Sequence, residues 1–206
     1  MERGTREQNI KRIIYLEDRI NQCQRCPRLI KCMRKPSFGK GDLEPDVMMI
    51  FESENNITTD MDQVIAMRDM IKERFDTDRV YHSFLVRCQP KACTARESSS
   101  CIIEGKYLDK DYVCLLTNQV CDGIPIKAST TEIMNCLPFM LEEINILRPY
   151  YVILFGEIVS SYILKSCGVY DIHDGQRSYK YNGITLITTV DEMSFNAEAA
   201  ASIGPA

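Results

Sequence analysis

The sequence predicts a three-layer α/β/α domain with a mainly parallel central sheet. Three short, largely apolar runs have the composition of buried strands. They are Asp46–Phe51, Val80–Val86 and Tyr150–Gly156. Segments with helical periodicity separate them, and an alternation of strands and helices is typical of α/β folds with parallel strands. In such sheets, ligands bind at the carboxyl ends of the strands.

Apolar residues recur at helical spacing ahead of the first cysteine and predict an amphipathic N-terminal helix. These residues are Ile10, Ile13, Ile14, Tyr15 and Ile20. The helix would carry Cys23 and Cys26 at its end. A second helix is predicted over Val64–Phe75, between the first two strands.

The clearest helix signal begins at Ser129. Ser129 and Glu132 have the spacing of a capping box, in which each side chain satisfies a free amide at the start of the helix. An apolar stripe follows and Pro149 stops the helix. The stripe consists of Ile133, Cys136, Leu137, Met140, Leu141, Ile144 and Leu147. Another helix, Glu157–Lys165, and a hairpin turn at Tyr181–Ile184 that leads into a strand at Thr185–Thr189 complete the pattern.

Length and composition suit one compact domain, because 206 residues with 45% apolar content can bury a sizeable core. We expect this domain to span 1–196, with a cysteine-rich insertion of no clear period at about 91–129 and a flexible tail at 197–206. The N-terminus has no apolar signal-peptide core, and no window is long enough to span a membrane. The predicted compartment is therefore the reducing cytoplasm.

Four of the ten cysteines occur in an order typical of metal ligands. Cys23 and Cys26 are two residues apart, so that one turn of chain can bind a metal centre through two thiolates. Cys88 follows the second strand, and Cys136 lies in the helix that begins at Ser129. Soft thiolate donors suit an iron–sulfur cluster or zinc. In a reducing compartment, metal ligation is favoured over disulfides.

Other assignments of the cysteines remain open. Cys93 could replace Cys88, or Cys32 could join the first pair, although Cys88 has the better context at the end of a strand. Cys32 and Cys167 are expected to be small buried side chains. A second metal site is possible in the insertion, but the cysteine spacing there matches no short finger or ferredoxin pattern. Its four cysteines are Cys93, Cys101, Cys114 and Cys121.

The net charge of −4 is unevenly distributed. Residues 1–40 carry eleven Lys and Arg against four Asp and Glu, or +7, which leaves −11 for the rest of the chain. A basic segment beside a metal site predicts a phosphate-contacting face, because cations displace condensed counterions from nucleic acid. A solvated helix face with scattered charges explains the bias equally well. The candidate nucleic-acid-binding residues are Arg25, Arg28, Lys31, Arg34 and Lys35.

Five short pieces of the chain occur in an order that a known family shares. They are Cys23-x-x-Cys26-Pro27-Arg28-Leu29, Gly39-Lys40-Gly41 before Asp46-Val47-Met48, Cys88-Gln89-Pro90, Glu132-x-x-x-Cys136, and Pro149-x-x-Val152-Ile153-Leu154-Phe155-Gly156. Together they resemble the iron–sulfur branch of the uracil-DNA glycosylase superfamily, often called family four or five, over about Ile20 to Met193. The resemblance implies a glycosylase-like fold and a DNA-binding groove over the strand ends. It also implies a four-iron, four-sulfur (4Fe-4S) cluster ligated by Cys23, Cys26, Cys88 and Cys136.

Several positions depart from that family's pattern. Only Glu52 matches the Gly-Glu-Ala-Pro-Gly that follows the family's first strand, so the glycines that let backbone approach a flipped nucleotide are missing. Phe84 stands where the family has an asparagine that reads the base edge. Asp191-Glu192-Met193 stands where the family has His-Pro-Ser, and an anionic Asp191 would repel a departing uracil anion. We therefore expect no ordinary uracil excision.

The candidate catalytic residues are Glu52, which could orient a water, His82, which could donate a proton, and Asp191. A lone His on a strand is more often structural, and His173 lies in a polar loop where we expect it to be solvated. The sequence favours a catalytically silent protein that binds DNA or another nucleic acid, or that serves as a subunit of a larger assembly. A DNA glycosylase that acts on a modified base through Glu52 is the alternative, and a redox protein is the third.

Overall fold

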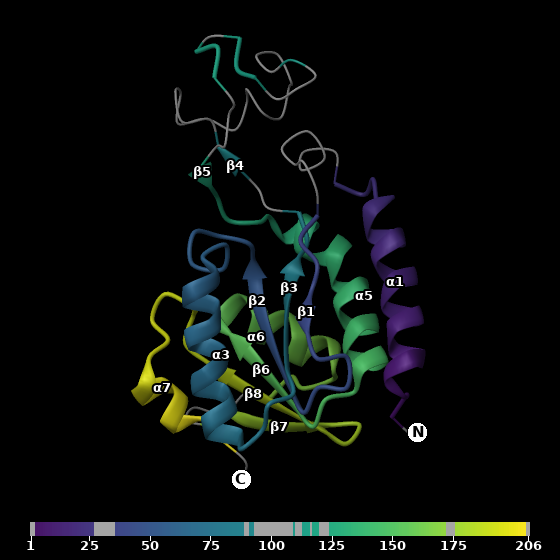
Figure 1. Ribbon diagram of the computed structural model, residues 1–206, viewed down its shortest axis with the longest axis vertical. Coiled ribbons are helices and arrows are strands. Elements are labelled where there is room, and N and C mark those ends of the chain that lie inside the picture. Colours follow the sequence, from purple (N-terminus) through teal and green to yellow (C-terminus); the bar gives the residue numbers. More distant parts are fainter. Residues whose placement is uncertain are drawn as a thin grey trace.

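The computed structural model describes residues 3–26, 36–88, 91–92, 109, 113–115, 117–119, 124–171 and 176–204. A six-stranded sheet lies at its centre, in the order β1-β3-β2-β6-β8-β7 (Figure 1). The four inner strands pair in parallel, and the two edge strands pair antiparallel. The α/β class is thus confirmed, with a mixed sheet. The strands are β1 (Lys40–Gly41), β2 (Val47–Ser53), β3 (Val80–Val86), β6 (Tyr151–Phe155), β7 (Ser178–Tyr181) and β8 (Ile184–Thr189).

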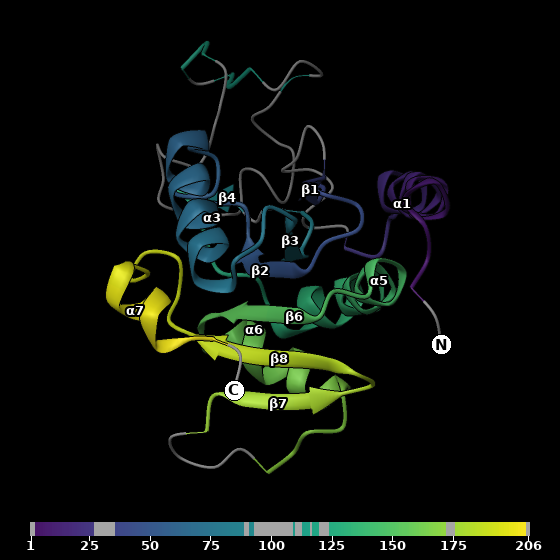
Figure 2. The same ribbon diagram turned by 60° about the horizontal axis from the view of Figure 1, so that its bottom comes forward.

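Helices cover both faces of the sheet (Figure 2). Side chains on alternate positions of each strand point to opposite faces, so Met48 and Ile50 of β2 pack in one core while Val47 and Met49 pack in the other. The first core contains α1 (Arg6–Asn21), α5 (Thr130–Leu147) and α6 (Gly156–Ser166). The second contains α3 (Met61–Phe75) and α7 (Ala197–Ser202).

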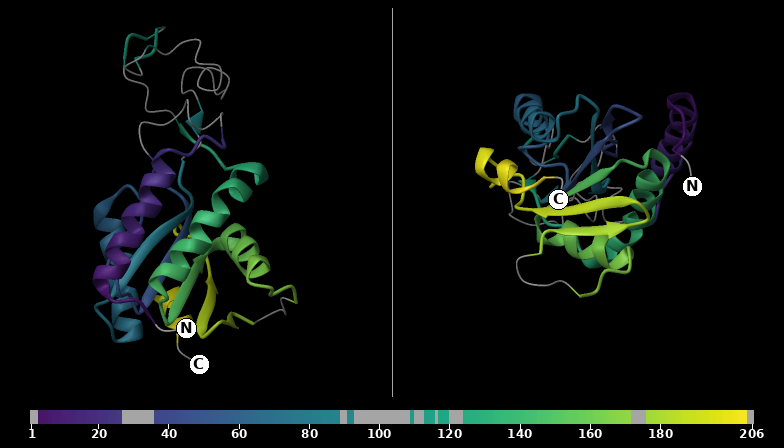
Figure 3. Two further views of the ribbon diagram at one scale, coloured as in Figure 1. Left: turned by 90° about the vertical axis from the view of Figure 1, so that its right-hand side faces the viewer. Right: turned by 90° about the horizontal axis from the view of Figure 1, so that it is seen from below.

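The N-terminal helix forms as predicted but buries a somewhat different face. Its buried apolar residues are Ile13, Leu16 and Ile20, whereas Ile14 and Tyr15, both assigned to the apolar stripe from the sequence, are exposed. The buried residues are spaced by three and four positions and face α5, which lies alongside α1 (Figure 3). Position on the helix therefore decides which apolar side chain is buried: Leu16 packs in the core, whereas Ile14 and Tyr15 point to solvent.

Side-chain caps fix where the main helices begin. Ser129 and Glu132 form the predicted capping box at the start of α5. Thr5 and Gln8 form a second box at the start of α1, which the sequence analysis did not identify. At its other end α5 stops at Arg148, whose positive φ of 46° turns the chain toward β6. Capping of this kind sets the positions of Cys136 on α5 and of the thiols that follow α1.

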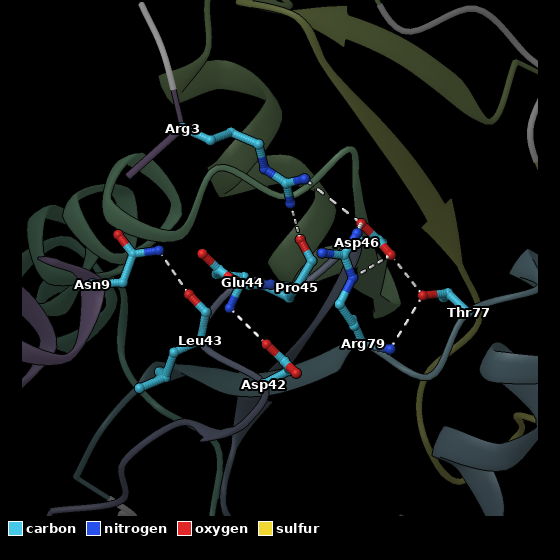
Figure 4. Close-up of polar contacts among 9 residues, drawn as sticks. All are labelled: Arg3, Asn9, Asp42, Leu43, Glu44, Pro45, Asp46, Thr77 and Arg79. Atoms are coloured by element: carbon cyan, nitrogen blue, oxygen red, sulfur yellow. Dashed lines mark hydrogen bonds and ion pairs between the residues drawn. The ribbon is translucent and has the colours of Figure 1, made fainter. Parts of the chain in front are cut away.

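Polar contacts join the N-terminus to the loop that leads into β2 (Figure 4). Arg3 donates to the carbonyl of Pro45 and lies 3.6 Å from the Asp46 carboxylate. Thr77 and Arg79 donate to the same carboxylate over 2.7 and 2.9 Å. These bonds lower the pKa of Asp46 despite its partial burial. These contacts therefore fasten the N-terminus and the start of β3 to the loop before β2.

The predicted insertion begins and ends in a small sheet of its own. β4 (Lys91–Ala92) pairs antiparallel with β5 (Ile124–Pro125) beyond the carboxyl end of β3 (Figure 1). Most of the chain between them lies outside the described residues. The pairing brings the two ends of this long segment together beside the larger sheet.

The C-terminal residues differ from the flexible tail expected over 197–206. Residues 197–202 form α7, which Asn196 caps and which packs against α3. Ala200 and Ile203 are buried in the second core. Apolar burial of two side chains thus anchors a segment whose small-residue composition indicated mobility. In the part of the chain that the structure describes, no helix has the length and apolarity needed to cross a membrane.

Candidate functional site

The four predicted ligand cysteines come from three separate elements. Cys23 and Cys26 follow the end of α1, Cys88 lies two residues beyond β3, and Cys136 is in the second turn of α5. The end of α1, the end of β3 and the start of α5 all lie at one end of the molecule (Figure 1). Cys26 and Cys136 are buried, and Cys23 and Cys88 are partly buried.

These thiols influence one another electrostatically. Burial, and then the negative charges of Cys136, Cys26 and Cys23, raise the pKa of the Cys88 thiol to about 12. Burial is the largest of these causes. No disulfide joins the six cysteines within the described residues. In that same part of the chain, no three His, Cys, Asp or Glu side chains are arranged to hold a single metal ion.

Hydrogen bonds hold the segments that carry the sulfurs. The backbone N–H of Arg87 donates to Cys136. Asn135 Nδ2 lies 3.5 Å from Cys26 Sγ and 3.1 Å from the carbonyl of Arg25. Arg25 in turn donates to the carbonyl of Asn135 over 3.3 Å, and its guanidinium lies 5.0 Å from the centre of the Phe139 ring. The chain after α1 is thus fastened to α5 at the thiols.

A buried ion pair lies directly behind Cys88. Arg87 donates to Glu143 of α5, and their side chains are 1% and 3% exposed. Tyr81 and Ser83 of β3 each donate to Glu143 over 2.7 Å. Sequence reasoning missed this group. Its signal was the spacing of Glu143, which lies three residues after Met140 and one before Ile144 and so falls on the buried face of α5.

Arg87 has one hydrogen-bond donor that the ion pair with Glu143 does not use. Its Nε is buried and has no hydrogen-bond partner among the described residues. Its positive charge acts on the thiols of Cys88 and Cys136 and lowers the pKa of each, against the larger raising effect of burial. A buried donor without a partner costs about 1–3 kcal/mol. A hydrogen-bond acceptor beside Nε would remove this cost.

A separate pocket of about 580 Å³ opens where β2, β6 and β8 end. Glu52 and Ser53 come from the end of β2, and Asp191 and Glu192 follow β8. The start of α6 forms one side. The remaining lining residues are Asn55, Asn56, Ile57, Ile126, Lys127, Phe155, Gly156, Glu157, Ile158 and Met193. Its volume is within the range of about 300–1,000 Å³ that small-molecule sites occupy.

Gly156 allows the sharp turn between β6 and α6 at the pocket wall. Its φ of +82° turns the chain sharply from β6 into α6. A side chain with a Cβ is strained in that conformation. The same Cβ would lie 3.5 Å from the Cβ of Asp191. The glycine therefore lets α6 start directly at the pocket wall.

The pocket is rich in carboxylates. Burial raises the pKa of Glu52, although Lys127 and the backbone N–H of Ala128 partly offset the effect. Burial also raises the pKa of Glu192, which the charges of Asp191 and Glu52 raise further. Asn55 donates a hydrogen bond to Glu192. Four carboxyl groups, including Glu157, thus face one cationic side chain among the described lining residues.

The structure brings together two of the three predicted catalytic residues. Glu52 and Asp191 line the same pocket. His82 does not line it: the residue is buried on β3, its ring 6.1 Å from that of Phe84, and burial lowers its pKa to about 4. His82 therefore lies in the core and away from this pocket. Asn55 and Glu192 are pocket residues that sequence reasoning did not select, although Glu192 adjoins Asp191.

Phe84 lies in the second core and outside the pocket lining. It packs near Phe51, with ring centres 6.1 Å apart. A base in the pocket would therefore not stack on Phe84. Replacing Phe84 by Asn would place a polar side chain in an apolar core, at a cost of several kcal/mol.

Several predicted residues lie outside the described part of the chain. Of the basic residues proposed for nucleic-acid binding, only Arg25 is described, and it is exposed. Among the insertion cysteines only Cys114 is described, and it is buried. Cys167 is partly buried, and burial raises its pKa to about 11. The residues outside are Arg28, Lys31, Cys32, Arg34, Lys35, Cys93, Cys101, Cys121 and His173.

Comparison with known proteins gives no family for this chain: no family model matches it, and no curated protein does.

Proposed function

We propose that this chain is a nucleic-acid-binding iron–sulfur protein with a three-layer, uracil-DNA glycosylase-like architecture and without ordinary uracil-excision activity. The observation that carries the proposal is that the end of α1, the end of β3 and the start of α5 lie at one end of the molecule. These three places carry Cys23, Cys26, Cys88 and Cys136. Thiolates are the ligands of 4Fe-4S clusters, and the order of these four is the one that the family resemblance implies.

The surroundings of the four thiols fit such a cluster. Cluster sulfurs accept hydrogen bonds that tune the cluster, and the buried Arg87 Nε is a donor in need of an acceptor. Thiolates around one zinc lie about 3.8 Å apart, because each Zn–S bond is about 2.3 Å. In a four-iron cluster, irons and sulfides separate the thiolates, so the thiolates lie farther apart than they do around one zinc. When bound, the cluster would cross-link α1, β3 and α5 and could carry one electron.

Arg25 supports the nucleic-acid part of the proposal. It is exposed, and the Asn135 carbonyl and the Phe139 ring hold its guanidinium beside Cys26. A fixed cation at the metal site is suited to a phosphate group. Reversing Arg25, Arg28, Lys31, Arg34 and Lys35 together should abolish binding of single- and double-stranded oligonucleotides, and binding by the wild type should fall steeply with salt.

The test of the cluster is purification without oxygen, followed by iron and sulfide analysis and absorption spectroscopy. We expect brown protein with about four irons per chain. Cys23→Ser and Cys136→Ser should lose the iron and unfold at lower temperature, because metal binding at such a site contributes folding free energy. Cys167→Ser is the matched control and should keep both. Colourless, zinc-loaded, fully folded protein would contradict the proposal.

A second candidate function is a DNA glycosylase that acts on a modified base. The observation in its favour is that Glu52 and Asp191 line one pocket at the carboxyl ends of the strands. A half-buried carboxylate such as Glu52 could orient and deprotonate an attacking water. Release of damaged bases from oligonucleotides, measured by chromatography with Glu52→Gln as the control, tests this function. Absence of nucleic-acid binding in any form would instead favour a protein partner.

A further inference from the structure

The charge of the pocket at the strand ends is opposite to what uracil excision needs. Uracil leaves as an anion, and an enzyme that releases it must aim hydrogen-bond donors or cations at that charge. Here Glu52, Glu157, Asp191 and Glu192 line the pocket with Lys127 as the one cationic side chain among the described lining residues. A negative charge placed among them would be repelled.

Partial burial strengthens this preference. Water screens the carboxylates of Glu52 and Glu192 less than it screens surface groups, and burial raises the pKa of each because it disfavours the charged form. A ligand with a positive charge would relieve that cost. The apolar side chains of Ile57, Ile126 and Ile158 provide non-polar wall beside the acids. The pocket thus suits a ligand that is cationic and also has apolar surface.

We infer that this pocket recognises a positively charged N-alkylated purine base. Such a base combines a delocalised positive charge with broad apolar faces. The inference rests on the second candidate function, because a base in a DNA duplex enters a pocket only after it leaves the base stack.

The chemistry of base release is consistent with the same ligand. When the glycosidic C–N bond of an alkylated purine breaks, its electron pair neutralises the cationic ring, and the base leaves uncharged. The sugar then carries the positive charge as an oxocarbenium ion. Water adds at C1′ and loses one proton, which the Glu52 carboxylate can accept. No donor to a leaving anion is required, which accounts for Asp191 at the position where the family has His.

The test compares three nucleosides by calorimetry with the full chain purified without oxygen. We expect 7-methylguanosine, at a pH where it is cationic, to bind roughly tenfold or more tightly than guanosine, and uridine to bind least. Glu52→Gln and Asp191→Asn should each weaken binding of the cation roughly tenfold. Lys127→Gln should strengthen it. Asp69→Asn, an exposed acid on α3, is the control and should change nothing.

The outcomes separate this inference from the functions on which it builds. Equal affinity for 7-methylguanosine and guanosine, or tighter binding of uridine, overturns the inference whatever the catalytic result. A clear preference for the cation that Glu52→Gln and Lys127→Gln shift in opposite directions supports it. If that preference is present but no base is released from 7-methylguanine-containing DNA, the glycosylase function fails and the pocket assignment stands.

Discussion

Removing Arg87 should destabilise the protein far more than removing an equally well-paired surface arginine. The Arg87→Met substitution leaves the Glu143 carboxylate 3% exposed without a countercharge. Breaking a buried pair in this way costs roughly 3–5 kcal/mol. For a chain of this size that loss lowers the unfolding temperature by roughly 6–20 °C. Tyr81 and Ser83 still donate to Glu143, which keeps the expected loss at the lower end of the range.

The structure provides a matched control one residue away. Arg19 of α1 donates to both carboxylate oxygens of Glu142 over 2.7 and 2.9 Å, but these side chains are 38% and 36% exposed. Arg19→Met should therefore cost no more than about 1 kcal/mol. Both pairs join an arginine to neighbouring glutamates of α5, and burial is the main difference between them.

A double-mutant cycle then separates the charge from the packing. Glu143→Gln alone leaves Arg87 charged and buried, whereas Arg87→Met with Glu143→Gln removes both charges and keeps an acceptor for the two hydroxyls. We expect the double variant to lose at least 2 kcal/mol less than the sum of the single variants. Thermal unfolding of samples with equal iron content is the assay. Losses under 1 kcal/mol for Arg87→Met, or strict additivity, would refute the reasoning.

Three further predictions follow from burial. Folding raises the pKa of Glu52, so its contribution to stability falls as the pH rises above about 4.5. Glu52→Gln should therefore be more stable than wild type at neutral pH and equal to it in acid, as measured by urea denaturation. Because folding lowers the pKa of His82 to about 4, wild type should lose roughly 3 kcal/mol between pH 6.5 and 4, and His82→Phe should lack this loss in the same titration. Ile203→Ala should cost roughly 2–5 kcal/mol because Ile203 is 1% exposed, while a difference no larger than that of Glu198→Ala would show that α7 does not anchor the C-terminus.

The regular elements could be predicted because local signals and burial agree there. The strand Val80–Val86 was placed with its observed bounds, and the capping box at Ser129 located the start of α5. Where the local sequence signal and burial conflict, burial decides which residues form the element and which side chains face the core. Tyr15 is apolar yet exposed, and the alanine-rich segment at 197–202 is helical because Ile203 and Ala200 enter the core.

The two candidate sites also differ in how far the sequence predicts them. Cysteines can be recognised as ligands from spacing, since few other roles require soft donors in that order. The pocket could not be derived from spacing, because Glu52, Asn55 and Glu192 meet only through the parallel pairing of β2, β6 and β8. His82 shows the converse. A histidine on a strand carries no sign of which face it occupies until the sheet register is known.

The pairing of β4 with β5 lets the fold accept changes in the length of the segment between these two strands. Lys91 faces Pro125 and Ala92 faces Ile124, so the chain leaves and re-enters the domain through adjacent strands. Closing a longer loop between fixed ends costs little, roughly 0.6 kcal/mol for each doubling of its length. Residues 93–123 could therefore be exchanged for a short hairpin turn, or for a segment from another protein, with little change in the stability of the six-stranded sheet. The junction of β4 and β5 is thus the place where a change in the length of this segment would disturb the central sheet least.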